Sequence, residues 1–123
     1  MCASRVHESQ AYALKADFFR VLRHPVRVRI LQLLRDGERS VGDLRDELEL
    51  ESSGTSQHLA ALRTQGFVAG RKEGTTIYYR LKDQRTLELL ELAEEIISSS
   101  LEGKRVLLDD RAEEDFGPRR GRG

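Results

Sequence analysis

Cysteine is almost absent from this chain, which has Cys2 alone among its 123 residues. A single cysteine cannot form an internal disulfide, so the sequence is typical of a reducing compartment and predicts a cytoplasmic location. Long hydrophobic runs are missing too. No stretch approaches the roughly 18 apolar residues of a membrane span, and the N-terminus has no signal-peptide pattern. We therefore expect no membrane partner.

Aromatic side chains make up only 6% of the chain and hydrophobic residues 38%, against 34% charged residues. This balance predicts one small domain with a limited core, for which self-association would bury further surface. Catalytic motifs are absent as well. The sequence has no Gly-rich phosphate loop, no His-Glu-x-x-His, no Cys-x-x-Cys and no Gly-x-Ser-x-Gly. We therefore expect a protein that is not an enzyme and needs no cofactor.

What the chain does contain is a series of short amphipathic segments. The expected elements, in order, are helices over 9–22, from Pro25 to Asp36-Gly37, over 40–48 and over 53–65, then a β-hairpin that turns at Glu73-Gly74, and a long helix from Asp83. Ser40 is expected to cap the third helix. In the second hairpin strand, Ile77, Tyr79 and Leu81 should face the core. Two short helices joined by a tight turn and followed by a hairpin predict a winged helix-turn-helix, a mainly α fold with a small β-hairpin.

The final helix has an apolar face that spans close to half of its circumference. A face so wide exceeds what one small domain needs, which predicts that a partner helix covers part of it. The predicted organisation is a flexible arm over 1–8, a domain over 9–108 and a disordered charged tail over 109–123.

The helix over 53–65 is unusual because it has so little to bury. Thr55, Leu59 and Leu62 fall on one side of a helical wheel, and the opposite side is small or polar. Such a surface can approach DNA closely, and Gln57 can hydrogen-bond an adenine edge in the major groove. Ser53, Thr55, Ser56 and the first backbone N–H groups can hold phosphate oxygens. An ordinary solvated surface helix is the competing interpretation.

Charge is segregated along the chain although the net charge is zero. Residues 53–82 have a net charge of +4 and residues 83–115 a net charge of −7. A basic block beside an acidic one indicates that one region meets a polyanion. The basic block includes the hairpin tip. The predicted DNA-binding residues are Ser53, Thr55, Ser56, Gln57, His58, Arg63, Arg71, Lys72, Thr75 and Arg80.

Four segments in order, HPVRVRILQLL, SVGDLRDEL, SGTSQHLAALRTQGFV and RKEGTTIYYRL, resemble the ArsR/SmtB family of bacterial transcriptional repressors. The resemblance covers about residues 10–100. It implies a homodimer that binds an inverted-repeat operator in double-stranded DNA, and a branch without metal ligands, some of whose members are linked to respiratory or hypoxic adaptation. It also implies dimerisation through the first and last long helices. The candidate dimerisation residues are Leu14, Phe18, Leu89, Leu90, Ala93, Ile96, Ile97 and Leu101.

The same resemblance predicts that the family's metal sites are missing. Ser40 and Gly42 occupy the positions of two thiolate ligands, and neither can bind a soft metal. The positions that match the site on the final helix are Asp83, Arg85, Ile96 and Ser99, of which only Asp83 is a competent ligand.

Two alternatives stay open. Cys2 and His7 could serve a metal- or thiol-responsive repressor, although two ligands on an arm fall short of the usual four. A winged helix could also dock a protein in place of DNA. The sequence does not give the inducer, the operator or the sign of regulation.

Overall fold

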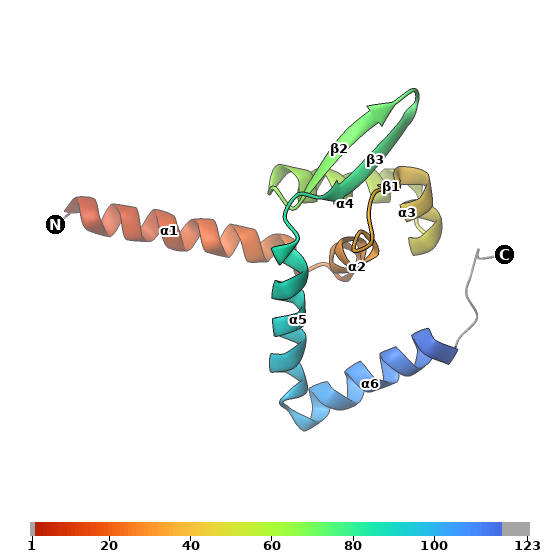
Figure 1. Ribbon diagram of the computed structural model, residues 1–123. Coiled ribbons are helices and arrows are strands. Elements are labelled where there is room, and N and C mark those ends of the chain that lie inside the picture. The colour runs from red at the N-terminus through yellow and green to blue at the C-terminus, as the bar shows by residue number, and fades with distance from the viewer. Residues whose placement is uncertain (1, 117–123) are drawn as a thin grey trace. The chain divides into compact units, whose positions relative to one another are not determined.

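The computed structural model describes the backbone of residues 2–116 and the side chains of residues 8–100 and 102–110. The chain divides into two units, residues up to Lys82 and residues from Asp83 onward. Figure 1 labels their helices and strands.

The first unit contains four helices and a three-stranded antiparallel sheet of strand order β1-β3-β2. The elements are α1 (Cys2–Val21), α2 (Pro25–Leu33), β1 (Arg39–Ser40), α3 (Val41–Leu48), α4 (Ser52–Thr64), β2 (Val68–Glu73) and β3 (Thr76–Leu81). Helices α3 and α4 form the helix-turn-helix, and β2 and β3 form the wing. The predicted winged helix-turn-helix is confirmed, with one addition: the two-residue strand β1 pairs with β3.

Local signals define the ends of these helices. Pro25 opens α2, where its missing N–H costs nothing. The Ser40 hydroxyl accepts a hydrogen bond from the Asp43 amide at 3.0 Å, so the predicted cap of α3 is confirmed. Gly66 ends the α4 segment in the left-handed region at φ 88°, and the next amide, of Phe67, donates to the Leu62 carbonyl at 2.9 Å. That pairing is a Schellman closure, and it passes the chain directly into β2.

The turn between α3 and α4 is tight. Glu49 adopts a left-handed conformation at φ 55°, and the Leu50 amide donates to the Arg45 carbonyl at 3.2 Å. Helix α4 then starts at Ser52, with Glu51 as its N-cap. Only Glu49, Leu50 and Glu51 separate the two helices, so the turn keeps the end of α3 close to the start of α4.

Buried hydrophobic residues from every element of the unit except α1 and β1 build its core. They are Ile30, Leu31, Leu34, Leu44, Leu48, Leu59, Leu62, Phe67, Val68, Tyr79 and Leu81. The C-terminal part of α1 joins them through Phe18, whose ring lies 4.5 Å from that of Phe67. Burial of each large side chain contributes about 1.5–3 kcal/mol. Leu59 and Leu62 therefore hold α4 to the body, as its wheel predicts.

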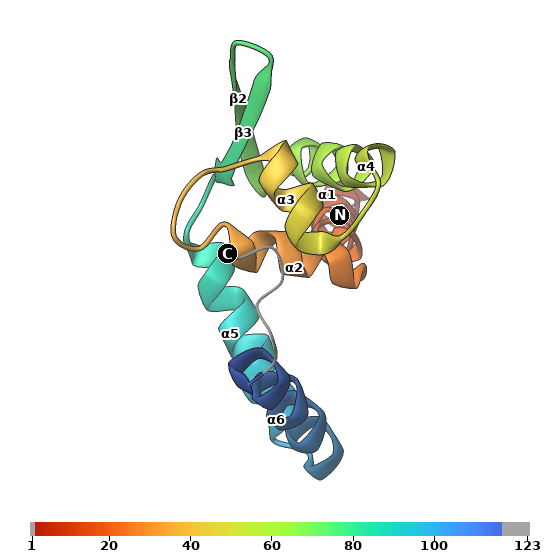
Figure 2. The ribbon, with the colours of Figure 1, turned by 90° about the vertical axis from the view of Figure 1, so that its right-hand side faces the viewer.

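The wing is a regular two-stranded ladder in which Glu73 pairs with Thr76. Gly74 occupies the first position of the two-residue turn at φ 64°, as a tight hairpin requires. Figure 2 shows the hairpin extending past the helices of the same unit. This extension corrects one prediction: Tyr79 and Leu81 are buried, but Ile77 is 38% exposed because the ladder has left the core before it reaches the tip.

The second unit contains α5 (Arg85–Ser98) and α6 (Leu101–Phe116). The single long helix predicted here is wrong: the chain bends between the two helices (Figure 1). Three consecutive serines, Ser98, Ser99 and Ser100, donate their hydroxyls to carbonyls three residues earlier, and the Ser100 hydroxyl also accepts from the Gly103 amide at 3.0 Å. Side-chain hydrogen bonds of this kind compete with the helix and cap the next one.

Two helices extend into the segments for which the sequence predicts an arm and a tail. Helix α1 begins at Cys2, and α6 continues through residues 109–116. Ala, Arg and Glu in both segments have high helix propensity, which predictions based on a buried stripe overlook. Residue 1 and residues 117–123 of the predicted tail lie outside the described residues. The three-part division of the chain stays a prediction.

Candidate nucleic-acid interface

Helix α4 exposes a row of small and polar side chains on the side opposite its buried stripe. Ser53, Ser56 and Gln57 are exposed, whereas Leu59 and Leu62 are buried. The exposed row has no long charged residue over its first two turns, so the backbone on this side is accessible to a close partner. Arg63 is exposed in the last turn of the helix.

The structure corrects the predicted contact between Thr55 and a phosphate oxygen. The residue is fully buried, and its hydroxyl donates to the Glu51 carbonyl at 3.1 Å. It therefore cannot reach a phosphate, and its role is to close the first turn of α4 from the inside. Its place on the buried side of the wheel was the signal that should have excluded it.

His58 lies half-buried on α4 and is held by a residue of α2. The Arg27 Nε–H donates to His58 Nδ1 at 3.1 Å, and the His24 ring centroid is 5.8 Å from that of His58. Burial, followed by the charges of Arg27 and His24, lowers the pKa of His58. Since Nδ1 accepts a hydrogen bond, the neutral imidazole has its proton on Nε2, which leaves Nε2 as the donor. Arg27 was not predicted, because 31 residues separate it from His58.

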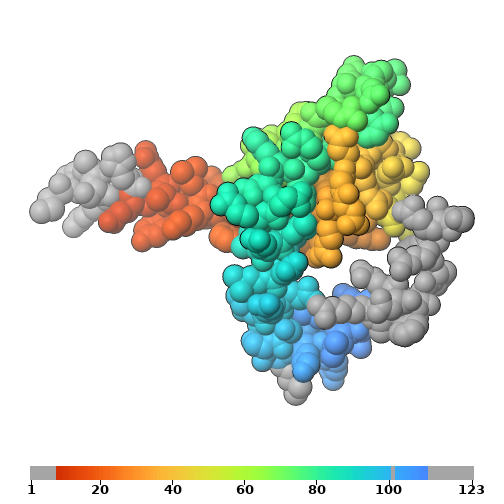
Figure 3. Space-filling model, viewed as in Figure 1, coloured from red at the N-terminus to blue at the C-terminus, as the bar shows by residue number. Residues whose placement is uncertain are grey.

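The wing presents basic and polar residues. Lys72, Thr75 and Arg80 are exposed, and Figure 3 shows the green hairpin standing at the edge of its unit. Arg71 is different. It forms ion pairs with Glu38 at 2.8 Å and with Glu73 at 2.6 Å, so its charge is already balanced.

Arg45 is a residue that the sequence reading missed. Its guanidinium donates to the Ser52 hydroxyl at 3.1 Å, which places a cation beside the first turn of α4. The tight turn at Glu49 brings these two residues together, and no spacing rule in the sequence signals it.

Comparison with known proteins identifies the family to which this chain belongs. The family model described as bacterial regulatory protein, arsR family, matches residues 24–69, from the start of α2 into β2. Rv0081, an uncharacterised HTH-type transcriptional regulator of Mycobacterium tuberculosis, is 42% identical over 100 residues, which cover 80% of this chain and 88% of the relative. The chain belongs to the arsR family of bacterial regulatory proteins.

Solved structures of the family agree with this fold. The crystal structure of Rv0081 matches with a TM-score of 0.68 at 41% identity, over 83% of this chain and 96% of that one. The homodimeric winged helix-turn-helix DNA-binding domain of Mb0332 from Mycobacterium bovis, solved by NMR, matches with a TM-score of 0.69 at 29% identity, over 76% and 87%. The transcriptional repressor BigR from Xylella fastidiosa matches with a TM-score of 0.64 at 30% identity, over 76% and 95%. The chain is thus a transcriptional regulator of this family.

The family's metal positions hold other groups here. Ser40 caps α3 next to Gly42, and the Asp83 carboxylate forms a two-oxygen ion pair with Arg85, with a shortest distance of 2.7 Å. This pairing lowers the pKa of Asp83 to about 2. The other two positions are Ile96 on α5 and Ser99, the C-cap of α5. Among the described residues no cluster of three or more His, Cys, Asp or Glu could hold a metal ion. The side chains of Cys2 and His7 lie outside the described residues.

The candidate dimerisation residues divide between exposed and partly exposed positions. Leu14 is 68% exposed, Ile96 65% and Ile97 50%. Phe18, Leu89, Leu90 and Ala93 are partly exposed, and the side chain of Leu101 lies outside the described ones. No helix of the described part of the chain is long and apolar enough to cross a membrane.

Proposed function

We propose that the chain is a homodimeric repressor that binds an inverted-repeat operator through α4 and the wing. The observation that carries this proposal is the exposed row of α4. Small side chains there permit close approach to a base pair, while Leu59 and Leu62, fully buried beneath, fix the height of the helix above the body.

In this proposal the residues of α4 have distinct roles. Gln57 reads an adenine edge in the major groove, since its amide offers both a donor and an acceptor. Ser53 and Ser56 hold phosphate oxygens together with the N–H groups of the first turn. His58 adds a phosphate contact from Nε2, and Arg63 a further one near the helix end. These contacts position the helix, while Gln57 selects the sequence.

The wing supplies contacts that do not depend on sequence. Lys72, Thr75 and Arg80 are exposed on it and reach the backbone beside the site that α4 reads. A second protomer places its own α4 about 34 Å away, one turn of DNA, so a half-site lies under each helix. The homodimeric architecture named for the Mb0332 domain supports this arrangement.

We infer that the protein responds to a signal other than a metal at the family's two sites. Their positions are held by the Ser40 cap, by Gly42 and by an Asp83 carboxylate that Arg85 neutralises. The respiratory or hypoxic role implied by the resemblance makes oxygen limitation the first condition for testing regulated expression.

Genome-wide DNA capture followed by footprinting tests the proposal. We expect protected inverted repeats, with binding that weakens as salt rises because phosphate contacts release counterions. A reporter fused to the captured promoter gives the sign of regulation: derepression on deletion supports a repressor, and loss of expression would show an activator. If micromolar protein retained no DNA in a salt-sensitive way, the DNA-binding proposal would fail, and protein docking would replace it.

A further inference from the structure

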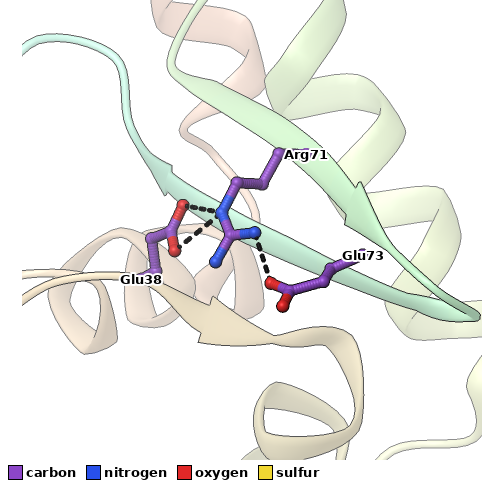
Figure 4. A network of polar contacts seen from close by, with 3 residues as sticks. All are labelled: Glu38, Arg71 and Glu73. Atoms are coloured by element: carbon purple, nitrogen blue, oxygen red, sulfur yellow. Dashed lines mark hydrogen bonds and ion pairs between the residues drawn. The ribbon is translucent and has the colours of Figure 1, made fainter.

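Three side chains contact the Arg71 guanidinium in the outer half of the wing, and Figure 4 shows two of them, Glu38 and Glu73. Its Nε–H lies 3.0 Å and 2.8 Å from the two carboxylate oxygens of Glu38. Its Nη1 donates to Glu73 at 2.6 Å. The guanidinium carbon lies 4.8 Å from the centre of the Tyr78 ring, within the range of a cation–π contact. These contacts fix the orientation of a side chain that is otherwise long and flexible.

This cluster spans the whole sheet. Arg71 is on β2 and pairs with Tyr78 on β3, while Glu38 directly precedes β1. The guanidinium therefore crosses the face of Tyr78 and reaches the far edge of the sheet. Strand β1 is only two residues long, and its second residue, Ser40, caps α3. The Arg71–Glu38 pair thus connects the wing to the point where the helix-turn-helix begins.

The charges of the cluster are unfavourable for a phosphate. Two carboxylates surround one guanidinium, and hydrogen bonding to Arg71 lowers the pKa of Glu38, which keeps this carboxylate ionised. The same bonds raise the pKa of Arg71 above its ordinary value. A phosphate that approached Arg71 would meet Glu38 and Glu73 at close range, and like charges at such distances repel.

Lys72 presents the opposite arrangement. Successive residues of a strand point to opposite faces, so Lys72, paired with Ile77, lies on the other face of the hairpin from Arg71 and Tyr78. It is exposed, and among the described residues it takes part in no ion pair.

We propose that Arg71 is a positioning residue, which sets the direction of the wing relative to α3 and α4 through Glu38, and that Lys72 makes the phosphate contact from the opposite face. The effect on DNA rests on the proposed function. The effect on the wing does not, because the cluster forms within the DNA-free chain.

The first measurement therefore uses the full-length protein without DNA. Glu38→Gln, Arg71→Gln and the double variant are compared by amide NMR shifts and hydrogen exchange, with Glu91→Gln on α5 as a matched control. We expect either single change to shift the wing amides and speed exchange at Arg39 and Ser40 in the β1–β3 ladder. The double variant should show amide shifts and exchange rates no larger than those of Arg71→Gln, because the two single changes remove the same interaction. Unchanged ladder exchange in both single variants, or additive effects, would overturn the proposal.

The second measurement is operator affinity as a function of salt. Glu38→Gln and Arg71→Gln should each weaken binding by about two- to fivefold, the range of exposed ion pairs, and leave the salt slope unchanged. Arg71→Lys should not rescue affinity, because an ammonium lacks the planar fork that spans the two carboxylates. Should Arg71 itself bind phosphate, Glu38→Gln would tighten binding and Arg71→Gln would reduce the slope by about one, which overturns the proposal. A wild-type chain that binds no DNA refutes the proposed function, while the NMR measurement still decides the role of Arg71.

Discussion

The two units of this chain bury their apolar residues very differently. Among the side chains that the structure describes, all eleven buried hydrophobic residues belong to the first unit, where they form its core. In the second unit, Thr86 is the only buried residue among the described side chains. Leu92, Ile96, Ile97, Val106 and Leu108 of that unit are each at least half exposed. The first unit has its own core, whereas the described residues of the second present apolar surface without one.

This difference indicates that the two units have different roles. A helix pair that exposes so much apolar surface is stable in water only when something covers it, and a second copy of the same face is the simplest cover. Leu14 and Phe19 of α1 are exposed in the same way. Substitutions in the core, α4 and wing of the first unit should therefore act on folding and DNA contact, and those on the apolar surfaces of α1 and of the second unit should act on assembly.

The largest expected effect is the loss of core packing in the first unit. Leu62→Ala should lower the free energy of unfolding by about 2–5 kcal/mol, since it removes a fully buried side chain and leaves a cavity. Urea denaturation at several protein concentrations measures this loss, which should not depend on concentration. Ile97→Ala is the matched comparison, and its effect should grow as the protein is diluted. If the two losses of unfolding free energy depended on protein concentration in the same way, the proposed difference between the two units would be wrong.

A charge on the apolar face of α5 should separate the protomers. Leu90→Glu and Ile97→Glu each place a carboxylate where the proposed partner helix packs, and an unpaired buried charge costs several kcal/mol. Sedimentation velocity should show a monomer at concentrations at which the wild type is dimeric. Glu91→Gln, on the same helix, should stay dimeric. A dimeric Ile97→Glu protein would mean that another surface holds the protomers together.

A smaller effect is expected at the reading surface. Gln57→Ala should lose about 1–3 kcal/mol of discrimination against a substituted base pair. Competition binding with single-base operator variants measures it. Gln65→Ala, at the other end of α4, removes the same side chain without the predicted base contact and should preserve the preference. Equal discrimination by wild type and Gln57→Ala would assign sequence reading to another residue.

Lys72→Ala should weaken binding to every DNA sequence to the same extent. Because one phosphate contact disappears, the slope of log affinity against log salt should fall by about one. Lys104→Ala on α6 removes the same charge from the second unit and should leave the slope intact. A drop that depended on the operator sequence would contradict a backbone contact.

The smallest effect concerns pH. His58 has a lowered pKa in the folded chain, so the unfolded chain binds its proton first as pH falls below about 6.5, the ordinary value. The stability that neutral His58 provides is therefore complete above that pH and is lost as the pH falls toward the lowered pKa. Thermal unfolding between pH 8 and pH 5, on the order of one measurement per half unit, should show a decline that His58→Gln reduces. An identical decline in both proteins would place the titrating group elsewhere.

Much of the fold was predictable because it depends on short-range signals. Pro25, the Ser40 cap and Gly66 mark helix ends by their own chemistry, and the spacing of Leu59 and Leu62 identifies the buried side of α4.

The remaining features depend on contacts that periodicity does not encode. Arg71 and Glu38 lie 33 residues apart and meet only because β1 and β2 flank the same strand. The polar side chain of Thr55 predicted a DNA contact, whereas its position on the wheel predicted burial. The structure shows that it is buried. Ile77 alternates correctly but lies beyond the end of the core. The break after Ser98 required knowledge of where three hydroxyls would bond.

The serine corner between α5 and α6 has a consequence for the choice of partner. Gly103 packs so closely against the Ile97 carbonyl that any side chain there would collide with it, so the bend is fixed by backbone as well as by hydroxyls. One residue inserted into the serine run would rotate α6 by about 100° and turn Val106 and Leu108 away from their present direction. Related regulators that differ by a single residue at this corner would present mismatched surfaces to one another.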